Sequence, residues 1–174
     1  MKIDHLGIAV KSLDESLQFY RDQLGLDVSL RETVAQEKVN VAMLPVGADA
    51  GNPGAEPRIE LLEPTQPDSV IGKFLERRGE GLHHIAIRVP DLNASVERLR
   101  ASGARLLNEP RVGAGGHVYV FVHPSSTGGV LIELIGAGGF LVYLLVFRET
   151  LITVESVERL LGLPVLASVP SRTP

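Results

Sequence analysis

The stretches DHLGIAVKSLDESLQFY (residues 4–20) and HHIAIRVPDLNASVERL (residues 83–99) are two versions of one pattern. With a single fixed offset, His5 falls on His84, and several apolar positions after them also coincide. Each version opens with the apolar alternation of a strand and continues, after a short turn, with apolar residues at helical spacing. The chain therefore predicts two copies of one strand–turn–helix unit.

The ends of the two copies repeat as well. RIELLEP (residues 58–64) matches LIELIG (residues 131–136), so that Glu60 falls on Glu133. Each copy is therefore predicted to be a βαβββ module, the first covering about residues 1–66 and the second about residues 81–136. The remaining strands are expected near residues 26–34, 38–46, 104–111 and 117–122, and a connecting helix near residues 69–78.

The composition limits the class of protein. The chain has 174 residues, of which 44% are hydrophobic and 22% are charged, which suits one compact domain. A net charge of -4 shows no basic excess, so we expect no nucleic-acid partner. There is no cysteine, which excludes disulfides and thiolate metal ligands. The amino-terminal residues lack the apolar stretch of a secretory signal, so a cytoplasmic location is expected.

One apolar stretch, LIGAGGFLVYLLVF (residues 134–147), carries no charge. A helix that spans a bilayer needs about 20 apolar residues. This stretch is shorter, and its first part reads as the end of a predicted strand. We therefore expect no membrane span.

The two matched histidines occupy an unusual strand face. Alternate side chains of a strand share one face, so His5 shares its face with Gly7 and Ala9. By the same alternation, His84 lies beside Ala86. A face made mostly of small residues suits the wall of a cavity better than a packed core.

The two matched glutamates indicate what such a cavity holds. Glu60 and Glu133 each stand between an isoleucine and a leucine on a predicted strand. An ionised carboxylate in apolar surroundings is costly unless it is paired or binds a metal. Any one of the four residues alone has an ordinary structural explanation, but the repeat places all four at matched positions. We therefore predict one divalent metal ion held by His5, Glu60, His84 and Glu133, a donor set that suits Co, Mn, Ni, Zn or Fe.

The other histidines are weaker candidates. His83 shares its strand face with two isoleucines, which indicates a structural role. His117 follows two glycines and is expected to be exposed. His123 precedes a proline in a predicted loop, from which it could reach a ligand.

IGKFLERRGEGLHHIAIRV (residues 71–89) and EPRVGAGGHVYVFVHPSSTGGVLIEL (residues 109–134) resemble the methylmalonyl-CoA epimerase family of the vicinal oxygen chelate superfamily. The resemblance covers residues 1–136 and implies an α+β fold, in which two paired βαβββ modules form a cupped mixed sheet around one metal site. Carried over to this chain, the metal ligands of the family are the four residues predicted above. The resemblance also implies an acyl-CoA substrate, interconversion of the two epimers of methylmalonyl-CoA, and a homodimer.

The implied reaction needs two acid/base groups, because epimerisation removes an α-proton from one face and returns a proton to the other. Glu133 is the candidate for one of them. Some members of the family carry a further acid on the third strand, but Val41 stands at the matching position here. A bound water and Glu37 are both left open as the second group.

Candidate substrate contacts come from the glycine-rich turn and the loop that follows the next strand: Gly115, Gly116 and His123. The glycines would let backbone approach the acyl group, or would only form a turn. A basic rim for the CoA phosphates could come from Lys73, Arg77, Arg78 and Arg111, and the sequence does not choose among them.

Two other functions are left open on the same scaffold. A glyoxalase-type lyase or isomerase would use the same ligands, and a metal-free member of the superfamily would only bind a small molecule. An extradiol dioxygenase needs two histidines, one carboxylate and open positions on its iron. The fourth ligand, Glu60, argues against that last activity.

Residues 137–174 continue past the expected end of the domain. The stretch from residue 136 to residue 170 resembles the segment in which the last membrane helix of a polysaccharide chain-length regulator leads into its cytoplasmic portion. Thr153 is placed to cap a helix that Gly162 and Pro164 would end. We therefore predict a short helical tail after a domain that ends at residue 136.

Overall fold

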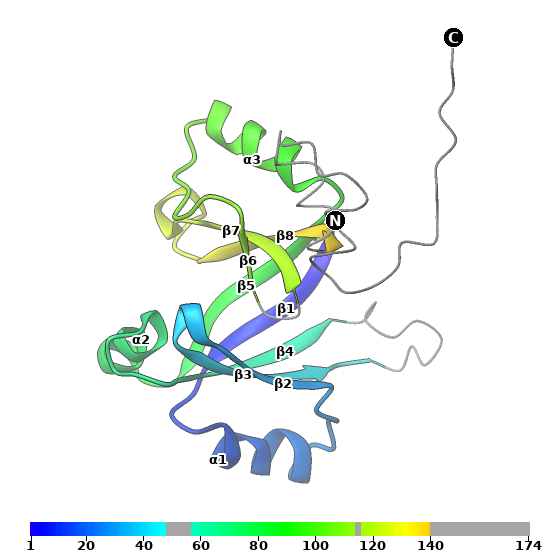
Figure 1. The fold of residues 1–174 in the computed structure, drawn as a ribbon, viewed down its shortest axis with the longest axis vertical. Helices are drawn as coiled ribbons and strands as arrows, with labels where there is room; N and C mark the ends of the chain where they lie inside the picture. The colour runs from blue at the N-terminus through cyan, green and yellow to red at the C-terminus, as the bar shows by residue number, and fades with distance from the viewer. Residues whose placement is uncertain (48–56, 114–115, 140–174) are drawn as a thin grey trace, which may run out of the picture.

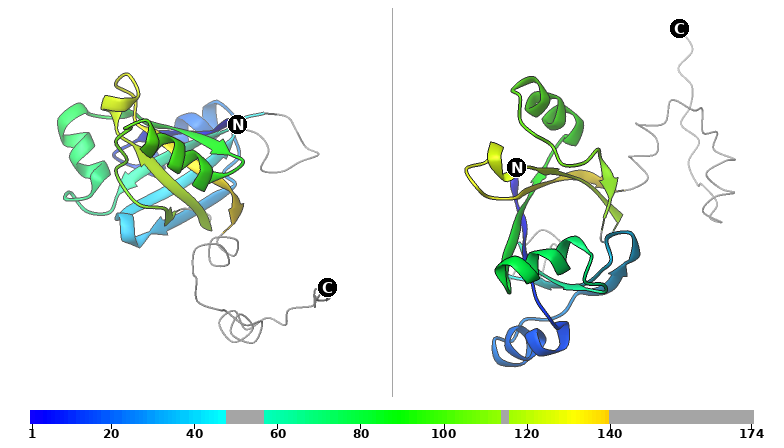
Figure 2. Two further views of the ribbon diagram at one scale, coloured as in Figure 1. Left: turned by 90° about the horizontal axis from the view of Figure 1, so that it is seen from above. Right: turned by 90° about the vertical axis from the view of Figure 1, so that its left-hand side faces the viewer.

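The computed structural model describes residues 1–47, 57–113 and 116–139 of the chain. Within these residues, eight strands form one sheet in the order β2-β3-β4-β1-β5-β8-β7-β6 (Figure 1). The sheet contains parallel and antiparallel pairs and is strongly curved, as Figure 2 shows. The predicted α+β fold with one cupped mixed sheet is therefore confirmed.

The two modules have the predicted order of elements. The first consists of β1 (Lys2–Ala9), α1 (Leu13–Leu17), β2 (Leu30–Val34), β3 (Val39–Pro45) and β4 (Arg58–Pro64). The second consists of β5 (Gly81–Val89), α3 (Leu92–Ala101), β6 (Arg111–Val112), β7 (His117–Val122) and β8 (Ile132–Gly139). Between them lies α2 (Val70–Arg78). Shorter elements in the described part of the chain include a π-helical turn, η1 (Gln18–Gln23), and the 3-10 turns η2 (Ala35–Glu37) and η4 (Pro124–Ser126).

The modules meet at the centre of the sheet through their first strands. β1 pairs antiparallel with β5, and Gly7 lies opposite His84. On either side, each first strand pairs in parallel with the last strand of its own module, β1 with β4 and β5 with β8. The four strands that carry the predicted ligands are therefore neighbours in space, although they are far apart in the sequence.

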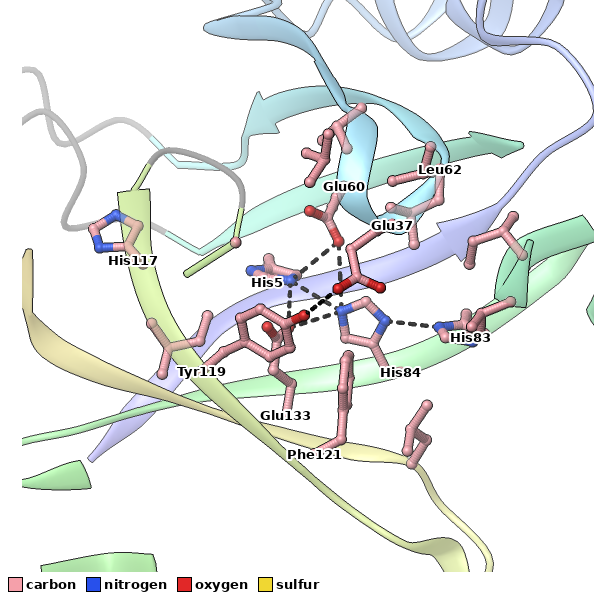
Figure 3. A pocket seen from close by; sticks show the side chains of 18 of the residues that line it. His5, Glu37, Glu60, Leu62, His83, His84, His117, Tyr119, Phe121 and Glu133 are labelled. Carbon is pink, nitrogen blue, oxygen red and sulfur yellow. Dashed lines mark hydrogen bonds and ion pairs between the residues drawn. The ribbon is translucent and has the colours of Figure 1, made fainter. Parts of the chain in front are cut away.

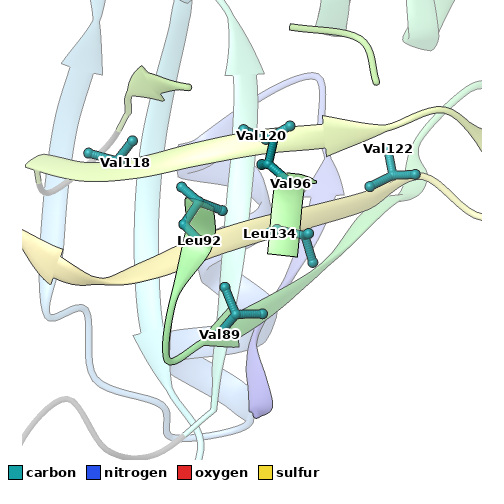
Figure 4. Packing of buried hydrophobic residues seen from close by; sticks show 7 residues of the cluster. All are labelled: Val89, Leu92, Val96, Val118, Val120, Val122 and Leu134. Carbon is teal, nitrogen blue, oxygen red and sulfur yellow. The ribbon is translucent and has the colours of Figure 1, made fainter. Parts of the chain in front are cut away.

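Helices begin where a side chain satisfies one of their free amides. Ser12, Ser69 and Asp91 each accept a hydrogen bond from the amide three residues further on. The helices that follow then pack apolar residues against the sheet, and Figure 4 shows this cluster in the second module, made of Val89, Leu92, Val96, Val118, Val120, Val122 and Leu134. Burying one such side chain stabilises a fold by about 1.5–3 kcal/mol.

β6 is shorter than the strand predicted near residues 104–111. It spans Arg111–Val112, and Leu106 makes one isolated bridge to Val122. Asn108 explains the difference, because its Oδ1 accepts a hydrogen bond from the amide of Phe121 at 2.8 Å. A side chain thus takes the place of the backbone partner that a longer strand would supply.

The last strand continues past residue 136, where the sequence predicts the end of the domain. β8 extends to Gly139, past residue 136, and pairs there with His117 of β7. The predicted helix of the tail lies outside the described residues. No helix in the described part of the chain is long and apolar enough to cross a membrane.

Substitution of Gly72 tests the packing at the start of α2. A Cβ atom at this position, in the first turn of α2, would lie 2.4 Å from the carbonyl oxygen of Pro67. Helix propensity alone favours alanine over glycine by about 1 kcal/mol, but here the clash is with backbone. We therefore expect Gly72→Ala to lower the melting temperature measured by circular dichroism. Glu76→Ala, an exposed change in the same helix, is the control, and a higher melting temperature for Gly72→Ala would contradict the prediction.

Candidate metal centre

The four predicted ligands lie side by side at the centre of the sheet. His5 is on β1, Glu60 on β4, His84 on β5 and Glu133 on β8, and their side chains point toward one another (Figure 3). These residues are 3%, 5%, 3% and 8% exposed, in that order. The structure thus brings together all four residues that the repeat singled out.

Their ligand atoms are close to one another. Nε2 of His5 and Nε2 of His84 are 3.0 Å apart. Oε2 of Glu60 lies 3.3 Å from the first nitrogen and 3.4 Å from the second. Oε2 of Glu133 lies 3.2 Å and 3.0 Å from the same two nitrogens. Four donor atoms therefore converge on one point.

This spacing fits a single divalent cation. Nitrogen and oxygen ligands bind such ions at about 2.1 Å, so neighbouring ligands are about 3.0 Å apart at right angles and about 3.4 Å apart at tetrahedral angles. The separations from each histidine Nε2 to the other and to the two carboxylate oxygens run from 3.0 to 3.4 Å. His5, Glu60 and His84 form a group whose ligand atoms all lie within 4.8 Å of one another, and Glu133 approaches both histidines as well.

Asp4 orients His5 from behind. Its Oδ1 lies 3.0 Å from Nδ1 of His5, which leaves Nε2 directed at the site. A register shift between Ile3 and His5 marks a bulge in β1, and a bulge turns side chains away from the regular alternation of a strand. A carboxylate on the outer nitrogen of a metal-binding histidine fixes both the tautomer and the ring orientation.

Two arginines balance the charge of Asp4. Arg88 Nε donates to Oδ2 of Asp4 at 2.6 Å, and the guanidinium of Arg58 contacts Oδ1. Burial disfavours the charged carboxyl, but the hydrogen bond with His5 and the charges of Arg58 and Arg88 outweigh it and hold the pKa of Asp4 well below its usual range. Asp4 is therefore ionised when it supports His5.

His83 supports the second histidine. Its Nδ1 lies 3.0 Å from Nδ1 of His84, and its ring packs edge-on against Phe74. Burial and the neighbouring His84 lower the pKa of His83 to about 4. His83 is therefore a neutral partner that holds the outer nitrogen of His84, which agrees with the structural role predicted for it.

The charges at the centre depend on one another. Burial lowers the pKa of His5, but hydrogen bonds with Asp4, Glu133 and Glu60 outweigh it and raise that pKa to about 11. Burial raises the pKa of Glu133, but hydrogen bonds from His5 and His84 outweigh it and lower that pKa. Without a metal ion, the centre therefore holds a protonated imidazole against an ionised carboxylate.

The centre opens into a cavity of about 280 Å³. Much of the remaining wall is apolar and includes Val41, Met43, Leu62 and Phe121. Val41 is 1% exposed and presents no acid, as the sequence indicates. The cavity therefore combines one polar centre with walls that suit an apolar substituent.

The turn between β2 and β3 links the two modules across this cavity. Tyr119 OH donates to Oε1 of Glu37 at 2.8 Å, and Gln36 Nε2 donates to the carbonyl of Val112 at 2.6 Å. Both Glu37 and Tyr119 line the cavity. Burial and the hydrogen bond to Glu37 raise the pKa of Tyr119, so its hydroxyl keeps its proton.

The residues considered for substrate binding do not all lie at the cavity. His123 caps η4, where its Nδ1 accepts from the amide two residues further on, and it is not among the residues that line the cavity. Gly116 has a φ of 72°, which favours glycine, and Gly115 lies outside the described residues. His117 is half-buried and lines the cavity, whereas the sequence predicts an exposed residue.

The four basic residues considered for binding the CoA phosphates also differ in whether they line the cavity. Arg111 lines the cavity, and its side chain is 60% exposed. Lys73, Arg77 and Arg78 are exposed on α2 and are not among the residues that line the cavity. Arg111 is therefore the best placed of the four to meet a ligand that enters the cavity.

Sequence reasoning missed the residues that support the centre: Asp4, Arg58, Arg88 and Tyr119. The charged residues Asp4, Arg58 and Arg88 stand within otherwise apolar strands, a pattern that could have indicated a buried ionic cluster. The bulge that turns Asp4 toward His5 leaves no such signal, because it depends on the pairing of β1 with β5.

Comparison with known proteins agrees with this geometry. A family described as the Glyoxalase/Bleomycin resistance protein/Dioxygenase superfamily matches residues 4–121. The mitochondrial methylmalonyl-CoA epimerase of Dictyostelium discoideum is 38% identical over 135 residues, which are 76% of this chain and 76% of that protein.

Solved structures show the same similarity. Methylmalonyl-CoA epimerase from Mycobacterium tuberculosis is 39% identical with a TM-score of 0.72, and the match covers 82% of this chain and 91% of that one. A Streptomyces coelicolor methylmalonyl-CoA epimerase variant in complex with 2-nitronate-propionyl-CoA is 39% identical with a TM-score of 0.74, covering 80% of this chain and 99% of that one. The chain therefore belongs to the Glyoxalase/Bleomycin resistance protein/Dioxygenase superfamily and has methylmalonyl-CoA epimerases among its relatives, which confirms the resemblance seen in its sequence.

Proposed function

We propose that this protein is a metal-dependent epimerase that interconverts (R)- and (S)-methylmalonyl-CoA. One observation carries the proposal: two buried carboxylates each lie within 3.0 to 3.4 Å of the same two histidine nitrogens, in a chain that belongs to this superfamily. Relatives named as methylmalonyl-CoA epimerases, at 38% to 39% identity, support the choice of substrate. The two buried carboxylates argue against a metal-free binding protein.

His5, Glu60, His84 and Glu133 are the proposed ligands of one divalent ion, which we expect to be Co, Mn, Ni or Zn. The two carboxylates form ion pairs with the two histidines, so a cation can take the place of the proton that His5 carries. When bound, such an ion supplies positive charge beside the thioester oxygen, where negative charge develops as the α-proton leaves.

Glu133 is the proposed acid/base group of the centre. Its carboxyl is buried in the sheet, and hydrogen bonds from His5 and His84 keep it ionised. An ionised carboxylate can take the α-proton of a bound thioester when it lies within hydrogen-bond reach of it.

The cavity is proposed to take the acyl part of an acyl-CoA. Its volume of about 280 Å³ is below the range for a drug-sized ligand, so the nucleotide part of CoA would extend outside it, past Arg111. A guanidinium binds phosphate well in such a position. Gly115 and Gly116 remain proposed contacts of the acyl group, whereas the imidazole of His123 is engaged in its own loop.

We also propose that the protein forms a homodimer. Ile3, Leu6 and Leu82 of the central strands are exposed, which supports the predicted homodimer, since exposed apolar patches often mark contacts between proteins. A cytoplasmic location stays a proposal. The separation of a domain at residues 1–136 from a helical tail at residues 137–174 likewise stays a proposal, with β8 extending the domain to Gly139.

Metal binding is expected to release a proton. His5 carries a proton in the metal-free protein at neutral pH, because its pKa is raised to about 11, and it must lose this proton to bind an ion. Below that pKa, each unit decrease in pH should therefore weaken the apparent affinity about tenfold. Titration calorimetry with a divalent ion, in two buffers of different ionisation enthalpy, measures the number of protons released. An affinity that does not change between pH 6 and 9 would contradict this assignment.

Gly7→Ala is expected to weaken metal binding without unfolding the protein. A Cβ atom at Gly7 would lie 2.1 Å from Cε1 of His84, so the imidazole must move. Displacement of a ligand or of its support typically costs about 10–100-fold in metal affinity. Gly136→Ala is the matched control, because its Cβ would meet Leu92 at an ordinary 3.5 Å. Equal affinities in the two variants would show that His84 is not a ligand.

The activity itself is tested with each epimer of methylmalonyl-CoA in deuterated water. The wild-type protein should invert the α-carbon and introduce deuterium there, a chelator should stop both, and a divalent ion should restore them. Glu133→Gln should slow inversion by at least about 100-fold, the usual contribution of an acid/base group. Glu76→Gln, an exposed residue on α2, is the control. Near-normal inversion by folded, metal-loaded Glu133→Gln would remove Glu133 from this role.

A further inference from the structure

An epimerase of the proposed kind needs an acid/base group on each face of the α-carbon, because a proton leaves one face and another arrives on the opposite face. Glu133 supplies one. Val41 stands in the wall of the cavity and cannot supply the other. Among the residues that line the cavity, the remaining carboxylate that is not a proposed metal ligand is Glu37.

Glu37 reaches the cavity from a different part of the fold than Glu133 does. Glu133 stands on β8, one of the four middle strands, whereas Glu37 ends η2, the turn between β2 and β3 at one end of the sheet. Because the sheet is curved, this turn contacts β6 and β7 of the other module, through Gln36 and Glu37. Figure 3 shows the carboxylate of Glu37 directed toward the space in front of the metal-site side chains. An acyl group in the cavity would therefore have Glu133 on the side of the sheet and Glu37 on the side of the turn.

The backbone and a neighbouring hydroxyl hold Glu37 in this position. Lys38, which follows it, has a φ of 54°, the one positive value at a non-glycine position among the described residues. Its ammonium group donates to Asp68 at 2.6 Å, which anchors the turn to the segment before α2. Tyr119 OH donates to Oε1 of Glu37 at 2.8 Å, leaving the other carboxylate oxygen without this bond. The side chain of Glu37 is 31% exposed, so water can exchange its proton between turnovers.

We propose that Glu37, positioned by Tyr119, is the second acid/base group of the site. The proposal rests on the proposed function. For one epimer, Glu37 takes the α-proton: the C–H bond breaks, an O–H bond forms on Glu37, and the electron pair is delocalised onto the thioester. In the form of the enzyme that acts on this epimer, Glu133 carries a proton taken up from water. It delivers that proton to the opposite face, where the new C–H bond forms, and it returns to the carboxylate. For the other epimer the two carboxyl groups exchange roles, and no oxidation or reduction takes place.

Two separate measurements test this assignment: inversion of each epimer, and entry of deuterium into each epimer without inversion. Glu37→Gln keeps the hydrogen bond from Tyr119 but removes the base. We expect inversion to fall by at least about 100-fold, while deuterium still enters one epimer, the one whose α-hydrogen faces Glu133. The other epimer should exchange no faster than it does without protein. Glu76→Gln, which makes the same chemical change outside the cavity, should behave like the wild type.

Tyr119→Phe tests whether the hydroxyl of Tyr119 positions Glu37 for catalysis or only links the two modules. It keeps the carboxylate of Glu37 and removes only the hydroxyl that positions it, so the same one-sided exchange should appear with a smaller loss of inversion. A purely structural link would instead lower the exchange of both epimers equally. Metal affinity and circular dichroism should match the wild type in both variants, since neither residue is a proposed ligand.

Several results would overturn the proposal. Inversion at the wild-type rate by Glu37→Gln would exclude Glu37, and so would an equal loss of exchange for both epimers in folded, metal-loaded protein. Failure of the wild-type protein to invert or exchange either epimer would overturn the proposed function, and this inference with it. The first two results concern Glu37 alone and leave the proposed function standing.

Discussion

Two buried carboxylates facing two histidines are the constraint on which the rest of the structure depends. Glu60 and Glu133 are 5% and 8% exposed, and such charges are costly away from water unless they are compensated. Here the compensation comes from His5 and His84, and hydrogen bonds with Asp4, Glu133 and Glu60 outweigh burial and raise the pKa of His5. A divalent cation can compensate the same two carboxylates. The proposed metal ion and the protonated imidazole of His5 would therefore do the same electrostatic job at this point.

The repeat explains how one chain assembles such a centre. Each module supplies one histidine from its first strand and one glutamate from its last, and the antiparallel pairing of β1 with β5 brings the two halves together. Gly7 leaves room for the imidazole of His84 at the point where the strands meet. The supports differ, since an ionised Asp4 holds His5 and a neutral His83 holds His84. Within the centre, the symmetry is therefore limited to the four proposed ligands.

The rim of the cavity has no such symmetry, and its chemistry differs between the modules. The first module contributes Glu37 from the turn after β2, and the second contributes Tyr119 from β7, and these two groups meet across the cavity. A substrate with one metal-binding end and one long CoA end is itself asymmetric. We infer that the symmetric centre holds the reacting part, while the asymmetric rim selects the faces and the entry direction of the ligand.

The sequence by itself determined the two βαβββ modules and the four converging residues, because strand alternation and a matched repeat are local patterns that survive in one dimension. The absence of an acid at position 41 was equally visible in the sequence. The tertiary structure decided the rest. The bulge that turns Asp4 toward His5, the half-buried position of His117, the shortening of β6 by Asn108 and the contact between Glu37 and Tyr119 all join residues through strand pairing or sheet curvature. Those relations depend on how distant segments meet, and no spacing along the chain encodes them.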